Sequence, residues 1–210
     1  MVIQETRVLF VGYKKEMKKY NIILASNSPR RKELLAGLDL EFEVKVINGI
    51  DESYPDMPCQ LVAQYIAGKK ADAYRTALNE SDLVITADTV VIVDNEILGK
   101  PRDEQDAKAM LRRISGRSHK VVTGVCLLTP GNRREFSVST DVTFKSLTDE
   151  EIDYYVEHYR PLDKAGAYGI QEWIGYVGVT ALNGSYFNVM GFPVQRIYSE
   201  LMKMQDADND

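Results

Sequence analysis

The chain has 210 residues, of which 44% are hydrophobic and 27% charged, a composition typical of globular proteins with a sizeable core. Its formal net charge of −5 argues against binding to nucleic acid polymers, because such proteins present a basic face. No apolar run reaches the ~20 residues of a membrane span, and Cys59 and Cys126 are isolated from each other, so we expect a cytoplasmic protein that binds no membrane.

The first predicted elements surround a basic turn. The apolar run at 21–25 predicts a buried strand, and Ser28 and Pro29 are typical of the N-cap and first residue of a helix. Residues 30–32 (Arg-Arg-Lys) then occupy the first helical turn, where the partial positive charge of the helix attracts anions and disfavours cations. This arrangement favours a phosphate-bearing ligand, and a solvated basic turn is the alternative.

Strands and helices alternate along the middle of the chain. Period-two alternation over 42–46 predicts a strand, and a helix is expected from about 58 to 77. Residues 83–93 carry the strongest strand signal, and the turn at 94–95 leads the chain back through 96–98 as a hairpin.

The second half continues this pattern. Residues 103–114 predict a helix with acids in its first turn and arginines in its last, as the helix dipole prefers. Strands are expected over 121–128 and 134–144, and the segment 148–158 predicts a helix whose first four residues form a capping box.

The last part of the chain is rich in glycine between residues 164 and 191. We expect a strand near 173–180, a turn at 183–184 and a final helix over 194–204. Strands mixed with helices, without a linker, predict a single α/β domain over residues 20–204 around one extended sheet.

Both ends of the chain are expected to lie outside this domain. Residues 205–210 are predicted to be a frayed tail, and residues 1–19 an N-terminal extension. We expect residues 1–16 to be dispensable, with Met17 as the working start.

Asp88 is the strongest catalytic candidate, because it lies within the apolar strand predicted over 83–93. A buried carboxylate needs solvent, a hydrogen-bond partner, an opposite charge or a metal. At the rim of a cleft it is a natural general base or Mg²⁺ ligand. The alternative is an aspartate that caps its own backbone at a bulge.

Other segments could complete a site for a nucleoside triphosphate. Lys100 lies just before a predicted helix, where its charge could meet a phosphate, and the loop residues 51–52 (Asp-Glu) could bind a hard cation. The glycine-rich segment 163–171 would let the backbone approach a ligand closely. The alternatives are a surface lysine, a solvated acidic loop and a tight loop. The P-loop pattern is absent, so this is not a P-loop enzyme.

The motifs together resemble the Maf (septum formation) family of nucleoside triphosphate pyrophosphatases. They span residues 21–201 in the order that this family has. The matching segments are S-N-S-P-R-R at 26–31, G-I-D-E at 49–52, T-A-D-T at 86–89, G-K-P-R-D at 99–103, S-G-R-S-H at 115–119, T-D-V-T-F at 140–144, D-K-A-G-A-Y-G-I-Q at 163–171 and G-S-Y-F-N-V-M-G-F-P at 184–193.

The resemblance implies a fold and a reaction. The fold would be α/β, with a single elongated mixed β-sheet flanked by helices and two lobes around a central cleft, as in inosine triphosphatase-like proteins. The reaction would be hydrolysis of a nucleoside triphosphate to the monophosphate and pyrophosphate with a divalent metal cation, Mg²⁺ or Mn²⁺. The chain looks like the subfamily that prefers dTTP and UTP, with modified pyrimidine nucleotides as further candidates, and family members are often homodimers.

The resemblance also assigns roles to single residues. It implies a general base at Asp88, a metal held by Glu52 and Asp88, and a set of residues that contact the phosphates or support the site: Ser26, Arg31, Lys70 and Lys100. It implies that the base is selected by a second set: Arg30, Thr89 and Gln171. Glu172 and Trp173 depart from the family pattern, in which glycine more often follows Gln171.

Asp88 and Thr89 pose a geometric problem, because neighbours in a regular strand point to opposite faces. If both reach one ligand, we expect the strand to end or bulge between Ala87 and Val90. An alternative function is a nucleotide-binding regulator of cell division without turnover. The presence of Asp88 together with Lys100 argues against this alternative, since binding alone needs no general base.

Overall fold

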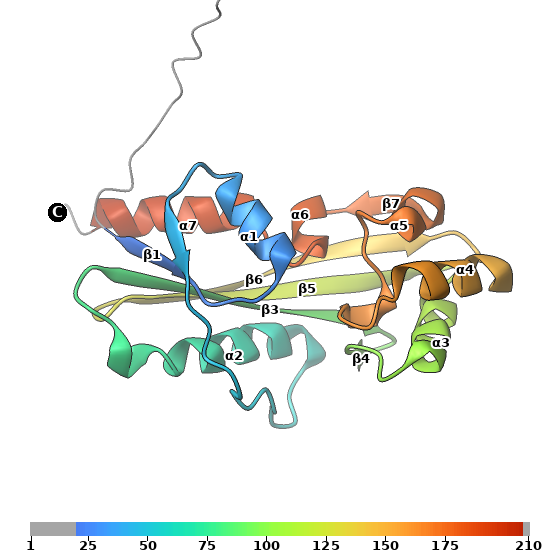
Figure 1. The fold of residues 1–210 in the computed structure, drawn as a ribbon, viewed down its shortest axis with the longest axis horizontal. Helices are drawn as coiled ribbons and strands as arrows, with labels where there is room; N and C mark the ends of the chain where they lie inside the picture. The colour runs from blue at the N-terminus through green and yellow to red at the C-terminus, as the bar shows by residue number, and fades with distance from the viewer. Residues whose placement is uncertain (1–19, 208–210) are drawn as a thin grey trace, which may run out of the picture.

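The computed structural model describes residues 20–207, so the predicted extension at 1–19 and residues 208–210 lie outside it. Within the described residues the strands are β1 (Asn21–Leu24), β2 (Phe42–Val44), β3 (Asp82–Val93), β4 (Glu96–Leu98), β5 (Ser118–Leu128), β6 (Arg133–Phe144) and β7 (Val179–Asn183). They form one sheet in the order β2-β1-β3-β5-β6-β7, with β4 paired to β3 (Figure 1). β1 pairs in parallel with β2 and β3, and the other pairs are antiparallel.

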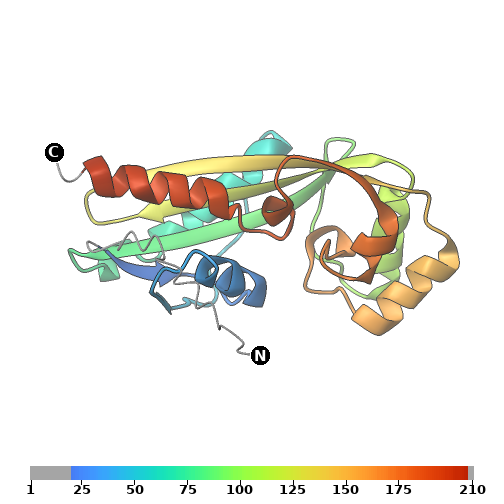
Figure 2. The ribbon, with the colours of Figure 1, turned by 90° about the horizontal axis from the view of Figure 1, so that it is seen from above.

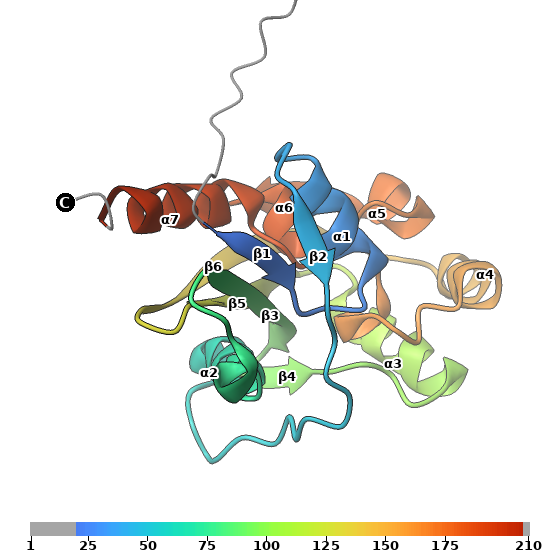
Figure 3. The same ribbon diagram turned by 60° about the vertical axis from the view of Figure 1, so that its left-hand side comes forward.

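Helices flank this mixed sheet, which confirms the predicted fold class. They are α1 (Pro29–Ala36), α2 (Cys59–Asp72), α3 (Glu104–Ile114), α4 (Asp149–Tyr159), α5 (Trp173–Gly178), α6 (Tyr186–Val189) and α7 (Val194–Ala207), with short 3₁₀ turns η1 (Arg75–Ala77) and η2 (Ala165–Ala167). α1 and α2 lie on opposite faces of the sheet (Figure 3). α3, α4 and α5 gather toward one end, away from α7 (Figure 2). Across residues 20–207, no helix combines the length and apolar character that crossing a membrane requires.

The helix starts form as their sequences predict. The Ser28 hydroxyl accepts a hydrogen bond from the N–H of Arg31 at the start of α1. Thr148 and Glu151 complete the capping box of α4. In both cases a side-chain oxygen pairs with an N–H group that the first helical turn leaves without a partner. α7 ends at Ala207, three residues later than predicted.

The prediction of a strand over 173–180 is wrong. This segment forms α5 and enters β7 only at Val179. An apolar run this short has no periodicity that separates a helix from a strand. The helical start is fixed instead by the Glu172 carbonyl, which accepts hydrogen bonds from the N–H groups of Gly175 and Tyr176.

The second predicted helix is shorter than expected, because α2 ends at Asp72 and η1 follows it. Between them, Tyr74 turns into the core. Its hydroxyl donates to the Lys45 carbonyl and accepts from the N–H of Ile47, both at 2.9 Å. The interruption therefore ties the segment after β2 to the end of α2.

β3 runs through the centre of the sheet, and its side chains alternate between two packed layers. Ile85 and Ala87 pack in one hydrophobic cluster with α1 and α7. Val90 and Ile92 pack in another with α2. This alternation assigns Asp88 to the α2 face and Thr89 to the α1 face of the sheet.

One edge of β3 lacks a strand partner for five residues. β1 pairs with β3 up to Ile85, and β4 pairs with it from Val91 onward. Both use the same edge, because β5 pairs along the other edge from Val84 to Ile92. Among the described strands, residues 86–90 therefore have a partner on one side only, and we call this stretch the open edge of β3.

α2 approaches the sheet very closely at Gly124 of β5. A Cβ atom at this position would lie 2.2 Å from the backbone nitrogen of Gln64 and 2.3 Å from the carbonyl carbon of Ala63. We expect Gly124→Ala to lower the free energy of unfolding by about 3 kcal/mol, because two backbones must move apart. Urea denaturation followed by circular dichroism measures this change.

Gly131, in the loop between β5 and β6, provides the matched control. A Cβ atom there would meet no other atom within 4 Å. Gly131→Ala should change the free energy of unfolding by less than ~0.5 kcal/mol. Equal stability of the two variants would contradict the close contact between α2 and β5.

Candidate functional site

A cleft of about 470 Å³ lies along the open edge of β3. Its walls come from the first turn of α1, from α2 and β3, and from the segments 52–54, 97–100, 163–171 and 189–191. This volume is within the range of small-molecule pockets. Of the residues assigned to the site from the sequence, only Ser26 does not line the cleft. The lining residues among them are Arg30, Arg31, Glu52, Lys70, Asp88, Thr89, Lys100 and Gln171.

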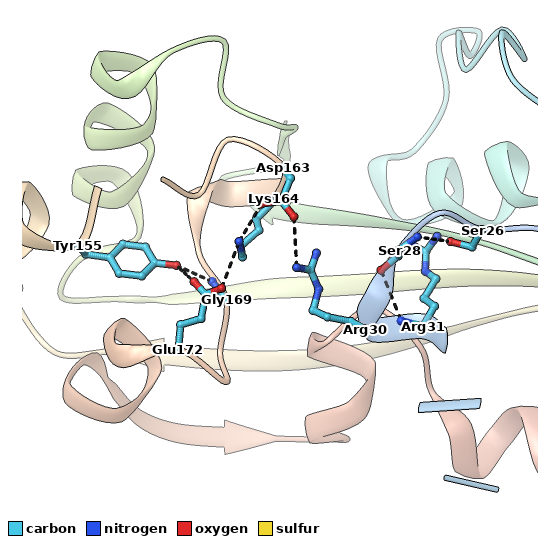
Figure 4. A network of polar contacts seen from close by, with 9 residues as sticks. All are labelled: Ser26, Ser28, Arg30, Arg31, Tyr155, Asp163, Lys164, Gly169 and Glu172. Atoms are coloured by element: carbon cyan, nitrogen blue, oxygen red, sulfur yellow. Dashed lines mark hydrogen bonds and ion pairs between the residues drawn. The ribbon is translucent and has the colours of Figure 1, made fainter. Parts of the chain in front are cut away.

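Ser26 lies behind the cleft wall, with only 7% of its surface exposed. Its hydroxyl oxygen accepts a hydrogen bond from the N–H of Ser28 at 3.2 Å (Figure 4). Ser28 itself lines the cleft and caps α1. Ser26 therefore shapes the turn that leads into α1.

Two carboxylates share one ammonium group on the α2 side of the cleft. Lys70 Nζ lies 2.8 Å from Asp88 Oδ1 and 2.9 Å from Glu52 Oε1. The Asp88 side chain is only 15% exposed, whereas that of Glu52 is 56% exposed. The polar residue in the apolar strand is therefore paired with an opposite charge, which offsets the cost of its burial.

The expected bulge between Ala87 and Val90 is absent. β3 keeps a continuous register with β5, in which Asp88 pairs with Gly124 and Thr89 with Thr123. Both residues nevertheless line the cleft, because it wraps around the open edge and receives side chains from both faces. The strand stays regular, and the missing neighbour strand resolves the geometric problem.

Arg31 ties the α1 side of the cleft together. Its guanidinium donates to the carbonyls of Ala87 at 2.8 Å and Gly191 at 2.9 Å, and to the Thr89 hydroxyl at 3.2 Å. Burial lowers the pKa of this group, and the charge of Asp88 opposes that effect. Of the five N–H donors of an arginine, these contacts use three, so two remain for a ligand.

Arg30 reaches across the cleft. Its Nη1 lies 3.3 Å from Asp163 Oδ2, and Asp163 Oδ1 accepts a hydrogen bond from Lys164 Nζ at 2.7 Å (Figure 4). Sequence reasoning placed the segment 163–171 beside the ligand through its backbone, but it assigned no role to the side chains of Asp163 and Lys164. The available signal was an adjacent acid and base at the start of a glycine-rich loop.

The cleft is more positive than the chain as a whole. Lys100 is exposed, and among residues 20–207 no ion pair involves it. Five cationic side chains line the cleft against three anionic ones, in a protein with a net charge of −5. Such a local excess favours a small anionic ligand. The cations are Arg30, Arg31, Lys70, Lys100 and Lys164, and the anions are Glu52, Asp88 and Asp163.

Gln171 presents an unpaired acceptor at the other side of the cleft. Its Oε1 atom is shielded from solvent and has no hydrogen-bond partner among residues 20–207. A buried carbonyl oxygen without a partner costs free energy, so it marks a position where a donor from a ligand would be stabilising.

The donor set for a metal is limited to carboxylates. In the described part of the chain, no group of three or more His, Cys, Asp or Glu side chains is arranged to hold a metal ion. Asp88 and Glu52 are hard oxygen donors that lie next to each other around Lys70. This set fits Mg²⁺, which is often held by one or two carboxylates together with water and substrate phosphates.

Comparisons with known proteins agree with this geometry. The family model described as "Maf-like protein" matches residues 21–204. A dTTP/UTP pyrophosphatase of Phocaeicola vulgatus is 58% identical over 189 residues, which cover 90% of this chain and 98% of the relative. The proteins of the same name from Porphyromonas gingivalis and Flavobacterium psychrophilum are 57% and 45% identical, over 91% and 90% of this chain and 98% and 97% of theirs. The chain belongs to the Maf-like protein family.

Proposed function

We propose that this protein hydrolyses dTTP and UTP to the nucleoside monophosphate and pyrophosphate. The observation that carries the proposal is that one cleft holds both a carboxylate pair around Lys70 and a group of cations. The names of relatives that are up to 58% identical support the same reaction.

Asp88 acts in this proposal as the general base. Lys70 fixes its Oδ1 atom, while no protein group among residues 20–207 pairs with Oδ2. Oδ2 can therefore accept a proton from a water molecule, a contribution typically worth ~10²–10⁴-fold in rate. The water oxygen bonds to the α-phosphorus, the bond to the bridging oxygen breaks, and pyrophosphate leaves.

The cations stabilise charge on the phosphate oxygens. Lys100 is exposed and has no ion-pair partner in the described part of the chain, so it can meet a phosphate without first losing one. Arg31 is already held in place by three hydrogen bonds, so its two remaining donors need no reorganisation when charge develops. Preorganised donors of this kind are a large source of rate enhancement in phosphoryl transfer.

Glu52 and Asp88 would hold a divalent cation together with the substrate phosphates. Such an ion, when bound, neutralises charge on the triphosphate and polarises the phosphoryl group. Lys70 keeps both carboxylates at the same place in the cleft, at 2.8 and 2.9 Å.

Gln171 accounts for the choice of base. Thymine and uracil present an imide N–H beside a 4-keto oxygen, and a primary amide offers the matching acceptor and donor. Turned toward the cleft, the Oε1 atom would accept the imide N–H. Cytosine reverses this pattern and would leave buried groups unpaired, which is an effective basis for discrimination. Arg30 and Thr89 are the proposed helpers on the opposite wall, although the hydroxyl of Thr89 already contacts Arg31 and Thr123.

We expect Asp88→Asn to lower kcat at least ~100-fold while the fold and nucleotide binding are retained, because the amide cannot accept the proton. Pyrophosphate release from dTTP measures turnover, and calorimetric titration measures binding. Asp153→Asn, at a half-buried position on α4 outside the cleft, is the control, and it removes only the ion pair of Asp153 with Lys108. A variant at position 88 that keeps more than about a tenth of wild-type kcat would sink the assignment. Binding without turnover in the wild-type protein would favour the nucleotide-binding regulator instead.

Removal of divalent cations with a chelator should abolish turnover, and Mg²⁺ should restore it. We expect Glu52→Gln to raise the Mg²⁺ concentration needed for half-maximal activity about tenfold, because one ligand loses its charge. The neighbouring Asp51→Asn is the control, since Asp51 pairs with Lys69 and Ser53 instead. An unchanged Mg²⁺ requirement in Glu52→Gln would remove this residue from the metal site.

Gln171→Ala should reduce kcat/KM for dTTP and UTP roughly tenfold more than for CTP, because only the 4-keto bases lose both partners. A panel that also includes modified pyrimidine nucleotides identifies the preferred substrate. Gln60→Ala, at an exposed position on α2, is the matched control. Equal losses for all three nucleotides would contradict the role of Gln171 in base selection.

A further inference from the structure

The turn that carries Gln171 is fastened at both ends by one buried phenol. The Tyr155 hydroxyl accepts a hydrogen bond from the N–H of Gly169 at 3.0 Å and donates one to Glu172 Oε2 (Figure 4). Within the turn, the N–H of Glu172 also donates to the Gly169 carbonyl at 3.0 Å. Gly169 and Glu172 are therefore held together through backbone and side chain, and we call this segment the 169–172 turn.

Tyr155 is suited to this double contact. It lies on α4 and is fully buried in the hydrophobic core. Burial raises the pKa of its phenol, so it stays a neutral hydroxyl that can both accept and donate hydrogen bonds. A neutral hydroxyl that donates to an ionised carboxylate makes one of the stronger hydrogen bonds found in proteins.

The side chains of Glu172 and Gln171 both lie close to Gly169. A Cβ atom on Gly169 would come within 2.9 Å of the Glu172 carboxyl carbon and 3.2 Å of Gln171 Nε2. The carboxylate that Tyr155 holds and the Gln171 amide therefore both occupy the space beside Gly169. We expect a change at Glu172 to alter the position of the amide even though Glu172 does not line the cleft.

We propose that Tyr155 and Glu172 are positioning residues that set the preference between pyrimidine bases by limiting the positions that the Gln171 amide can take. This inference rests on the proposed role of Gln171 in base selection. Neither residue lines the cleft, so we expect both to act on the ratio of kcat/KM between UTP and CTP rather than on the chemical step.

A second contact of Glu172 allows its two functions to be separated. Glu172 Oε1 forms an ion pair with Lys164 Nζ at 3.1 Å. Glu172→Gln keeps an oxygen that can accept from Tyr155 but loses the charge that faces Lys164. Glu172→Ala loses both. If the hydrogen bond positions the turn, the glutamine variant retains most of the selectivity and the alanine variant does not.

The test measures kcat/KM for dTTP, UTP and CTP in Tyr155→Phe, Glu172→Ala, Glu172→Gln and Gln171→Ala. We expect Tyr155→Phe and Glu172→Ala to lower the UTP/CTP ratio roughly two- to tenfold, the range of one hydrogen bond. Tyr155→Phe should change this ratio no further when Gln171 is already alanine, because the hydroxyl acts through that side chain.

Tyr159→Phe is the matched control. It lies on the same helix, stacks on Tyr155 with ring centroids 5.1 Å apart, and is 38% exposed. The single tryptophan of the chain, Trp173, follows Glu172 directly and gives an independent readout. Acrylamide should quench the fluorescence of Trp173 more strongly in Tyr155→Phe and Glu172→Ala than in the wild-type protein. Quenching should stay unchanged in Tyr159→Phe.

Two outcomes separate failure of this inference from failure of the proposed function. If Gln171→Ala lowers the UTP/CTP ratio but Tyr155→Phe and Glu172→Ala, each with near wild-type thermal stability, leave it unchanged, the positioning role is overturned. A uniform loss for all three nucleotides in both variants overturns it as well. If Gln171→Ala itself leaves the ratio unchanged, base selection by Gln171 is wrong, and the positioning role fails with it.

Discussion

The open edge of β3 determines how the cleft is built. β1 stops pairing with β3 at Ile85, and β4 starts pairing with it at Val91. Among the described strands, residues 86–90 of β3 therefore have a partner only on the side of β5. Side chains from both faces of a regular strand can then reach one space. The α2 face contributes Asp88 with its partner Lys70, and the α1 face contributes Thr89. A cleft at this edge can therefore combine a carboxylate site and a guanidinium site that a complete sheet would separate.

An open edge also exposes backbone groups that need partners. Arg31 supplies one of them, because it donates to the Ala87 carbonyl while it also binds Gly191. This accounts for part of the unusual cluster of cations in the first turn of α1. The helix dipole disfavours Arg31 at that position, but the three hydrogen bonds of its guanidinium outweigh a penalty of only ~0.3–1 kcal/mol.

Features that depend on neighbouring residues could be predicted from the sequence, whereas features that depend on tertiary contacts could not. The caps at Ser28 and Thr148 depend on residues three positions apart, so pattern alone predicts them. The order of the motifs likewise predicted most of the residues that line the cleft. The open edge depends on where β1 and β4 begin and end, and no residue pattern within 83–93 predicts it. The alternation of side chains between the two faces of a strand therefore led to the expectation of a bulge. The contact between Tyr155 and Glu172 joins residues 17 positions apart, on α4 and at the start of α5.

The Arg30–Asp163 ion pair is a weak contact between two segments that line the cleft. The two side chains are 25% and 60% exposed, and such pairs contribute only ~0–1 kcal/mol. If Arg30 helps to select the base as proposed, a nucleotide that enters the cleft competes with Asp163 for this guanidinium, and displacing Asp163 costs little free energy. Physiological salt screens the pair further. Under the proposed function, binding of a nucleotide would therefore need only the exchange of one partner for another at Arg30.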